Sequence, residues 1–359
     1  RDLRHPQGGF FSSEDADSEG AEGKFYTWAW DDLVAEVGQD IAAALGAGPE
    51  GNWEGTNVLW RPSGEAAVPD DPRKRLLAAR EKRVRPANDD KVLAGWNGLA
   101  ISALAVTGRA FGRSDYVKAA GAAADFVLSA LRRDDGRLLR AWRDGRTSGP
   151  AYADDHALMA AACLDLYEST FDERWFEEAR RLASDLVRLF SDQERGGFFQ
   201  TGADAERLVL RPKELFDNAV PSGNSGAAEV LLRLSLLTGD AEHERAGLAA
   251  FRAVRDLLDR APTAFGTALG ALDLYLGPSR EVAIVGDRDD PRTDALVAEV
   301  WSRYLPRTVW AAGAPGSEAP VPLLQGREAV EGQPAAYVCE RFVCQRPVTD
   351  PSELAVQLG

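Results

Sequence analysis

The sequence predicts a mainly helical protein built from helical hairpins, and a repeated helical unit carries that prediction. A unit of two helices recurs three times, and its copies open near a polar residue, at Asn97, His156 and Asn224. Each of these residues lies 19 positions before a matching residue of the second helix, namely Tyr116, Trp175 and His243. Hairpins that repeat every ~60 residues bury their apolar faces only against their neighbours, which predicts a toroid or a solenoid.

The two helices of each unit differ in character. The first ones, such as LAISALAVTGRAF and ALMAAACLDLY, contain few charges, whereas partners such as WFEEARRLASDLVRLF are amphipathic at helical spacing. We therefore expect the first helices to line the inside of the ring and the second helices to face water. Asn97, His156 and Asn224 would then lie on one rim of the ring.

The loops between the hairpins share a design. Gly8–Phe11 and Gly196–Phe199 are identical in sequence, and Asp135–Leu138 takes a similar place after a second helix. Each of them predicts a tight turn that leads into a short strand of a rim hairpin. The first loop continues into a long insertion at about 12–88. Within it, helices are expected over Asp31–Leu45 and Asp71–Arg83.

The chain changes character after the last hairpin. We expect a helix over Pro262–Leu276, a strand at Glu281–Gly286, a helix over Asp290–Tyr304 and a strand near Thr308–Trp310. This order predicts a small α/β addition, and it contains no G-x-G-x-x-G motif for a dinucleotide. The expected domains are therefore a partial toroid at 1–278 and an α/β extension at 279–359 that packs on it.

Composition excludes several classes of function. The 359 residues, 45% of them hydrophobic, can bury a large core, but no apolar run reaches the ~18 residues of a membrane span. A net charge of −15 argues against nucleic acid as a partner, because phosphate binding needs Lys and Arg.

The three cysteines, Cys163, Cys339 and Cys344, match neither a disulfide framework nor a zinc pattern, so a cytoplasmic location is expected. On one straight strand Cys339 and Cys344 would face opposite ways, so they could pair only across a turn.

A series of motifs then points to a family. In order along essentially the whole chain, the sequence contains GGFFSSEDADSEG, GKFYTW, EKRVRP, WNGL, RPKE, PSGNS and CERFVCQRPVTD. Together they resemble the YyaL and spermatogenesis-associated group of thioredoxin-domain-containing proteins. The resemblance implies an (α/α)6 toroid similar to N-acylglucosamine 2-epimerases and six-hairpin glycosidases. It also implies a thioredoxin-like domain elsewhere in the full-length protein, which would be a partner of the toroid.

Counting helices indicates a ring that is incomplete at its N-terminal end. Seven ring helices are expected from Asn97 onward, whereas six hairpins require about twelve, so about five are expected to precede Arg1. An incomplete ring would expose apolar surface, which makes a partner-dependent scaffold one functional alternative.

Paired carboxylates are the first candidates for catalysis. Sugar chemistry commonly uses one protonated and one ionised carboxyl group, and clustered acids raise the pKa of one another. The expected catalytic acids are Asp89, Asp90, Asp154 and Asp155, and the expected substrate-binding acids are Glu14, Asp15, Asp17 and Asp217. Helix capping is the competing interpretation, because acids directly before helices accept hydrogen bonds from helix N–H groups.

Basic rim residues also have two interpretations. His156 is a candidate catalytic proton shuttle or a structural histidine. Lys91 and Lys213 would bind an anionic group of the substrate or form plain salt bridges.

Amides and aromatic rings complete the candidate site. Asn97 and Asn224 would orient substrate hydroxyl groups, and Trp96 would stack on a sugar ring unless it packs in the core. The acidic loop Glu14–Glu19 lacks the phase of an EF-hand, so neither a metal site nor a cofactor is expected.

The sequence therefore predicts a carbohydrate-active domain with epimerase- or glycosidase-like acid/base chemistry on a sugar or sugar-like small molecule. The alternative is a non-catalytic module that binds a ligand or a protein beside a thioredoxin-like domain. Acids and amides that converge on one cavity would favour catalysis or small-molecule binding. Side chains that are consumed by helix N–H groups would favour the binding module.

Overall fold

A computed structural model describes residues 2–62, 68–206, 209–316 and 320–359. The chain divides into two compact units. The first is Phe11–Asp90 together with the start of the chain, and the second is Arg4–Phe10 together with Lys91–Gly359.

The first unit packs helices α1 (Trp30–Val37), α2 (Gln39–Ala44) and α3 (Asp70–Arg80) around a small core that includes Trp28 and Leu33. One helix over 31–45, as the sequence predicts, is wrong. Gly38 ends α1 with a φ of +83°, a conformation open to glycine, and α2 starts at the next residue.

Four very short strands accompany these helices. Strand β1 (Ser13–Glu14) pairs with β4 (Asn88–Asp89), and β2 (Asp17–Ser18) pairs with β3 (Ala21–Glu22).

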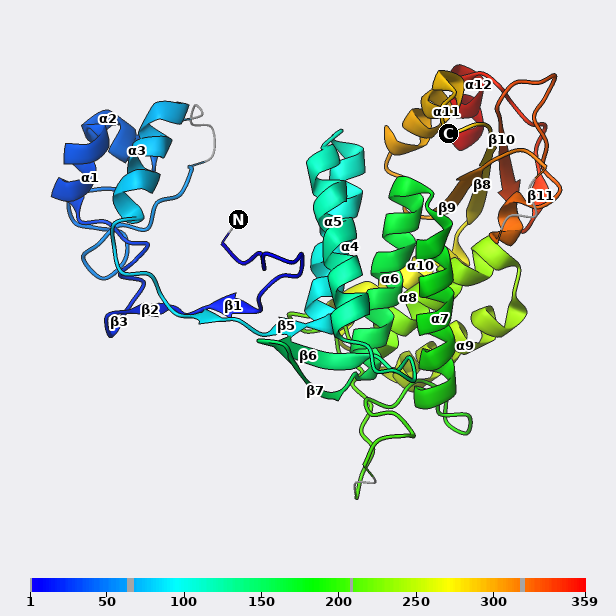
Figure 1. The fold of residues 1–359 in the computed structure, drawn as a ribbon, viewed down its shortest axis with the longest axis horizontal. Coiled ribbons are helices and arrows are strands. Elements are labelled where there is room, and N and C mark those ends of the chain that lie inside the picture. The colour runs from blue at the N-terminus through cyan, green and yellow to red at the C-terminus, as the bar shows by residue number, and fades with distance from the viewer. Residues whose placement is uncertain (1, 63–67, 207–208, 317–319) are drawn as a thin grey trace. The chain divides into compact units, whose positions relative to one another are not determined.

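The second unit is a series of helical hairpins, as the repeats predict (Figure 1). Its first helices are α4 (Ala94–Ala110), α6 (Ala153–Thr170), α8 (Gly223–Thr238) and α10 (Gly266–Leu276), and each packs against the next. The second helices α5 (Ser114–Ala130), α7 (Glu173–Phe190) and α9 (Ala241–Leu258) pack against their own partners. This arrangement confirms a mainly helical fold of the α/α-toroid type.

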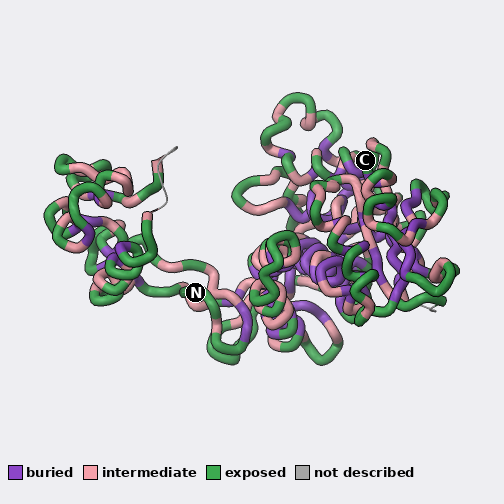
Figure 2. The backbone as a smooth tube through the Cα atoms, turned by 90° about the horizontal axis from the view of Figure 1, so that it is seen from above, coloured by how far each residue is buried: buried purple, intermediate pink, exposed green. Residues whose placement is uncertain are grey.

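Burial follows the expected inside and outside helices (Figure 2). Helix α6 is buried over almost its whole length, whereas α7 buries one face, which includes Trp175 and Phe176. The α4 and α6 backbones approach closely at Gly98, where a Cβ atom would lie 2.7 Å from the carbonyl oxygen of Leu158. Any side chain larger than glycine would push these two helices apart.

The rim loop between α5 and α6 forms the expected hairpin, with β6 (Leu139–Arg143) between β5 (Val92–Leu93) and β7 (Arg146–Pro150). The turn at Gly8–Phe11 is followed by a short strand, β1, as expected, whereas no strand follows Gly196–Phe199 before α8 in the described residues. Each of these turns makes a single bridge, Arg4 with Phe10 and Ser191 with Phe198.

The C-terminal α/β addition is confirmed. Its sheet has the order β11-β10-β8-β9, formed by β8 (Arg280–Val285), β9 (Thr308–Gly313), β10 (Ala335–Glu340) and β11 (Val343–Cys344). Strands β8 and β9 are parallel and are joined through α11 (Pro291–Trp301), and α12 (Pro351–Leu358) ends the chain. The domain boundary expected at 278 stays a prediction.

Cys339 and Cys344 form a disulfide across the β10–β11 turn, the one geometry that the sequence leaves open to them. Cys163 is buried in α6 as a free thiol. Within the described ranges, every helix falls short of the length and apolar character needed to cross a bilayer.

Candidate functional site

Two rim asparagines hold the loops that precede their helices. Asn224 accepts a hydrogen bond from the Phe198 N–H at 2.7 Å and donates to the Phe198 carbonyl oxygen at 2.9 Å. Asn97 makes the same pair of bonds with Phe10, at 2.8 and 3.0 Å. Both amides are buried, so they bind backbone groups and not a ligand hydroxyl. At Phe198 these bonds also occupy the backbone polar groups that a continuing strand would need.

His156 takes the corresponding place in the middle hairpin and is completely buried. Its Nδ1 lies 2.9 Å from the Tyr152 carbonyl oxygen, and its Nε2 lies 2.9 Å from Arg137 Nη1. The carbonyl can only accept, so Nδ1 donates and Nε2 accepts from the guanidinium. Burial lowers the pKa of His156 to about 4, with the nearby Arg137 charge acting in the same direction. The imidazole is therefore neutral at pH 7 and both nitrogens are occupied.

Asp155 lies in the first turn of α6, and both of its carboxylate oxygens accept hydrogen bonds from backbone N–H groups. Its carboxylate accepts from the Gly95 and Tyr152 N–H groups, both at 2.9 Å, and lies 2.8 Å from Arg140 Nη1. Burial and the neighbouring Asp154 charge raise the pKa of Asp155 to about 6, and Arg140 opposes them. The N-cap itself is Tyr152, so Asp155 satisfies helix N–H groups from inside the first turn.

Asp217 and Lys213 also have structural partners. Asp217 accepts from the Ser222 N–H at 2.9 Å and from the Thr267 N–H at 2.8 Å, which ties the loop before α8 to the start of α10. Lys213 lies 2.7 Å from Asp192 Oδ2 and donates to the Gly196 carbonyl at 2.6 Å. Of the two interpretations for Lys213, the structure therefore shows the salt bridge. Its bond to Asp192 lowers the pKa of that carboxyl group to about 2.

The first unit holds five of the predicted acids. Glu14 accepts a hydrogen bond from the Tyr26 hydroxyl group and lies 3.1 Å from Arg85 Nη1. Asp15 accepts a hydrogen bond from the Asp17 N–H at 3.1 Å. Asp89 lies in β4 and Asp90 follows it. The sequence expectation that these two directly precede a helix is wrong, because β5 comes first.

Two candidates of the second unit lie near the start of α4. Lys91 is exposed just before β5. Trp96 is 44% exposed, so its indole ring is free of the core, but it is not among the residues that line the pocket described next.

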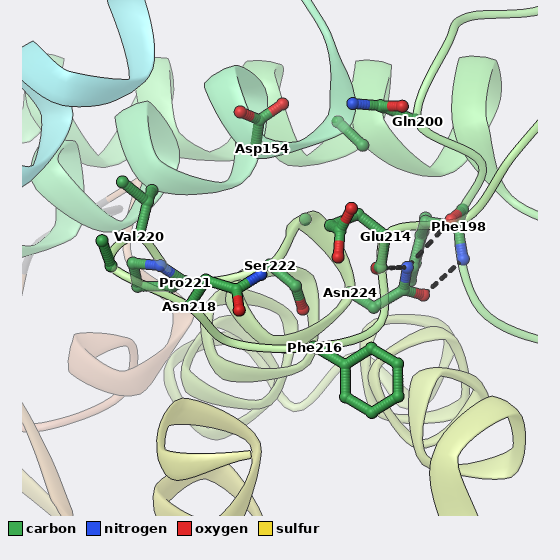
Figure 3. A pocket seen from close by; sticks show the side chains of 13 residues that line it. Asp154, Phe198, Gln200, Glu214, Phe216, Asn218, Val220, Pro221, Ser222 and Asn224 are labelled. Atoms are coloured by element: carbon green, nitrogen blue, oxygen red, sulfur yellow. Dashed lines mark hydrogen bonds between the residues drawn. The ribbon is translucent and has the colours of Figure 1, made fainter. Parts of the chain in front are cut away.

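A pocket of about 270 Å³ opens where α6 and α8 begin (Figure 3). We call it the α6–α8 pocket. Its polar lining residues are Asp154, Gln200, Glu214, Asn218, Ser222 and Asn224, and its apolar ones include Phe198, Phe216 and Val220. Of the residues predicted from sequence, it brings together Asp154 and Asn224.

Glu214 is the most available acid of this pocket. Its side chain is exposed, and among the residues that the structure describes its carboxylate has no hydrogen-bond or ion-pair partner. Its own backbone is fixed, because Asn224 Nδ2 donates to the Glu214 carbonyl oxygen at 2.7 Å. Phe216 stands in the same loop with 41% of its surface exposed.

Asp154 is held more tightly than Glu214. Its Oδ2 lies 3.5 Å from Arg140, while its Oδ1 is buried and has no partner among the described residues. A buried oxygen without a donor costs free energy, which a bound donor group would recover.

The sequence did not single out Glu214, Gln200 or Phe216 as site residues. The available signal was position, since Glu214 ends the RPKE motif and only residues 215–220 separate it from PSGNS. No group of three or more His, Cys, Asp or Glu side chains in the described ranges is placed to hold a metal ion.

No family model matches the chain. The human spermatogenesis-associated protein 20 is 32% identical over 99% of this chain and 52% of its own length, and the mouse protein is 31% identical over the same shares. This chain therefore spans about half the length of the curated relatives it matches.

Solved structures with some likeness include the GH76 α-mannanase of Bacteroides thetaiotaomicron and cellobiose 2-epimerase from Bacillus thermoamylovorans. The first is 16% identical with a TM-score of 0.42, over 61% of this chain and 59% of that one. The second is 9% identical with a TM-score of 0.41, over 71% and 68%. The sequence matches confirm the resemblance that the motifs indicate: over nearly all of its length, the chain is similar to about half of spermatogenesis-associated protein 20.

Proposed function

We propose that the α6–α8 pocket binds a sugar or a sugar-like polyol and that its carboxylates perform acid/base chemistry on it. The observation that carries the proposal is the pairing in one pocket of Glu214, whose carboxylate has no partner among the described residues, with the exposed aromatic ring of Phe216. Carboxylates and amides bind hydroxyl groups, and an aromatic ring covers the apolar face of a sugar. The volume of about 270 Å³ lies at the small end of ligand pockets, which fits a single ring better than an oligosaccharide.

The two acids have different roles in this proposal. Glu214 is exposed, so its carboxylate can reach a proton of the bound substrate and exchange it with solvent. Asp154 is held beside Arg140 at the start of α6, and its buried Oδ1 has no partner among the described residues. Asp154 would therefore accept a hydrogen bond from a substrate hydroxyl while Glu214 transfers the proton.

Asp155 and His156 have positioning roles in this proposal. Both are buried and bound to backbone groups or arginines, so they set the course of the chain at the start of α6. Asn97 and Asn224 do the same for the loops at Phe10 and Phe198.

The alternative function, a binding module without catalysis, also has a specific observation in its favour. In four of the predicted rim residues the polar side-chain atoms are hydrogen-bonded to other groups of the protein, namely in Asn97, Asp155, His156 and Asn224. In that case the α6–α8 pocket holds a ligand but changes no bond in it.

Proton NMR in D2O separates these functions. The full chain is incubated with D-mannose, N-acetyl-D-glucosamine or cellobiose, and spectra are followed over time. Epimerase-like chemistry replaces the hydrogen next to the carbonyl by deuterium, and glycosidase-like chemistry produces new reducing-end signals from cellobiose. Either change should disappear in Glu214→Gln and persist in Glu242→Gln, which alters an acid that is 84% exposed on α9. If the sugar binds but its spectrum stays unchanged, the protein is a binding module without catalysis. If no sugar binds at all, the proposal is rejected.

A further inference from the structure

A second cavity lies further along the same inner helices. It has a volume of about 540 Å³ and is bounded by α4, α6, α8, α10, the end of α11 and β9. On α6 it is lined by Asp165 and Glu168, which follow Asp154 by 11 and 14 residues. At ~1.5 Å of rise per residue, they lie about 16 to 21 Å along the helix from the α6–α8 pocket. This cavity is therefore a separate site.

Three carboxylates of this cavity surround one cation. Arg233 of α8 lies 2.7 Å from Asp165, 2.9 Å from Glu168 and 3.6 Å from Glu229. The fourth acid in the lining, Asp273, is already paired with Arg307. With the three carboxylates ionised, the group around Arg233 carries an excess of two negative charges. Such an excess inside a protein is costly unless a further cation enters.

One oxygen of this group is buried and unpartnered. Glu168 is 5% exposed, its Oε2 accepts from Arg233 Nη2, and its Oε1 has no hydrogen-bond partner among the described residues. Native structures rarely leave such an atom unsatisfied. Desolvation of this side chain also raises the pKa of Glu168 to about 7, despite the opposing charge of Arg233. The oxygen is therefore placed to accept a hydrogen bond from a molecule inside the cavity.

Three aromatic residues line one side of the cavity. Trp301 and Trp310 lie edge to face with ring centroids 5.1 Å apart, and Tyr304 is 90% exposed beside them. Aromatic faces attract organic cations. The Glu229 side chain is 37% exposed, so one carboxylate can be reached from outside while Glu168 marks the buried end.

We propose that this cavity, which we call the Arg233 cavity, binds a small organic dication such as a diammonium compound. One ammonium group donates to the free oxygen of Glu168 and to Asp165, and the other lies near Glu229 and the aromatic rings. The charge of such a molecule matches the excess of two negative charges that the group carries once Glu168 is ionised, and a bound ammonium group favours that ionised form. A metal ion fits less well, because the described residues contain no group with the arrangement of metal ligands and Arg233 already occupies the centre.

Isothermal titration calorimetry on the full chain tests this proposal with putrescine (1,4-diaminobutane) as the probe and 1,4-butanediol as its neutral counterpart. The expected result is saturable binding of one putrescine per chain and no binding of the diol. Glu168→Gln should weaken putrescine binding at least about tenfold, the loss of one charge-assisted hydrogen bond. Glu242→Gln on α9, which removes an exposed charge, should leave it unchanged.

Glu229→Gln keeps the test valid if Glu168→Gln fails to fold, because Glu229 is partly exposed and lies further from Arg233. It should weaken putrescine binding while keeping the thermal unfolding of the wild type. The proposal is overturned if putrescine does not bind, if the diol binds equally well, or if folded Glu168→Gln and Glu229→Gln both bind putrescine as the wild type does. Binding of Ca²⁺ in place of putrescine would also overturn it.

Discussion

Asn224 binds both backbone polar groups of Phe198, and with the same side-chain amide it reaches the carbonyl oxygen of Glu214. One buried side chain thus joins two separate segments of the α6–α8 pocket wall. The sequence predicts that Asn224 orients substrate hydroxyl groups. In the structure Asn224 instead fixes the position of Glu214, the residue that we propose acts on the substrate.

Asn224→Ala should therefore affect both stability and binding. It leaves the buried backbone groups of Phe198 and the partly buried carbonyl oxygen of Glu214 without their partner, which should lower the free energy of unfolding by about 3 kcal/mol. Sugar affinity should fall as well, because Glu214 is no longer held in place. Chemical denaturation and calorimetry measure the two effects. Asn218→Ala, an exposed residue of the same pocket, should change stability little; equal losses in both variants would contradict this role of Asn224.

The hairpin order of the fold could be predicted from sequence because it rests on local patterns. The 19-residue offset and the contrast between α6 and α7 follow from helical periodicity alone. The break at Gly38 could not be foreseen, since glycine inside a helical pattern is often tolerated.

The site was harder to predict than the fold. Polar residues at equivalent positions of the repeated helices predicted a shared cavity. In the structure the side chains of Asn97, His156 and Asn224 instead bind backbone groups of the loop that precedes each helix. Glu214 lies in an irregular loop without periodicity, where only tertiary structure decides which side chain enters the pocket.

The protonation of His156 should make stability depend on pH. Its pKa is lowered to about 4 in the folded chain against about 6.5 when unfolded. A depressed pKa contributes stability that is complete above the unfolded value and is lost as the pH falls through the folded value. About 3 kcal/mol should be lost between about pH 6.5 and 4. Urea unfolding across this range should show a steeper acid loss for the wild type than for His156→Gln, and identical slopes would exclude His156 as the cause.

The protonation of Glu168 should make stability depend on pH in the opposite direction to that of His156. Its pKa is raised to about 7 by burial, with Asp165 adding to the rise and Arg233 opposing it. Glu229 also faces the Arg233 group, and the Asp273–Arg307 pair contributes no net charge. A raised pKa gives stability that is present below the unfolded value, near 4.5, and is lost as the pH rises to about 7. The stability of Glu168→Gln should therefore improve relative to the wild type from pH 5 to pH 8, as measured by urea unfolding. An unchanged difference would contradict an ionising Glu168.

The Cys339–Cys344 disulfide should stabilise the C-terminal sheet modestly, because it closes a short loop. It confines Arg341 and Phe342, which both have positive φ values and donate backbone N–H groups to the buried Glu281 carboxylate. Reduction should lower the free energy of unfolding by about 2 kcal/mol. The double variant Cys339→Ser/Cys344→Ser should unfold earlier and ignore reductant, whereas Cys163→Ala should keep the response. A wild type that is insensitive to reductant would contradict the stabilising role.

Calorimetric titration of D-mannose and N-acetyl-D-glucosamine into the full chain decides whether the α6–α8 pocket is a sugar site. We expect saturable binding of one sugar per chain, which is lost in Glu214→Gln and in Phe216→Ala and retained in Glu242→Gln. A wild type that takes up no sugar at tens of millimolar, or binding that survives both pocket substitutions, would contradict it.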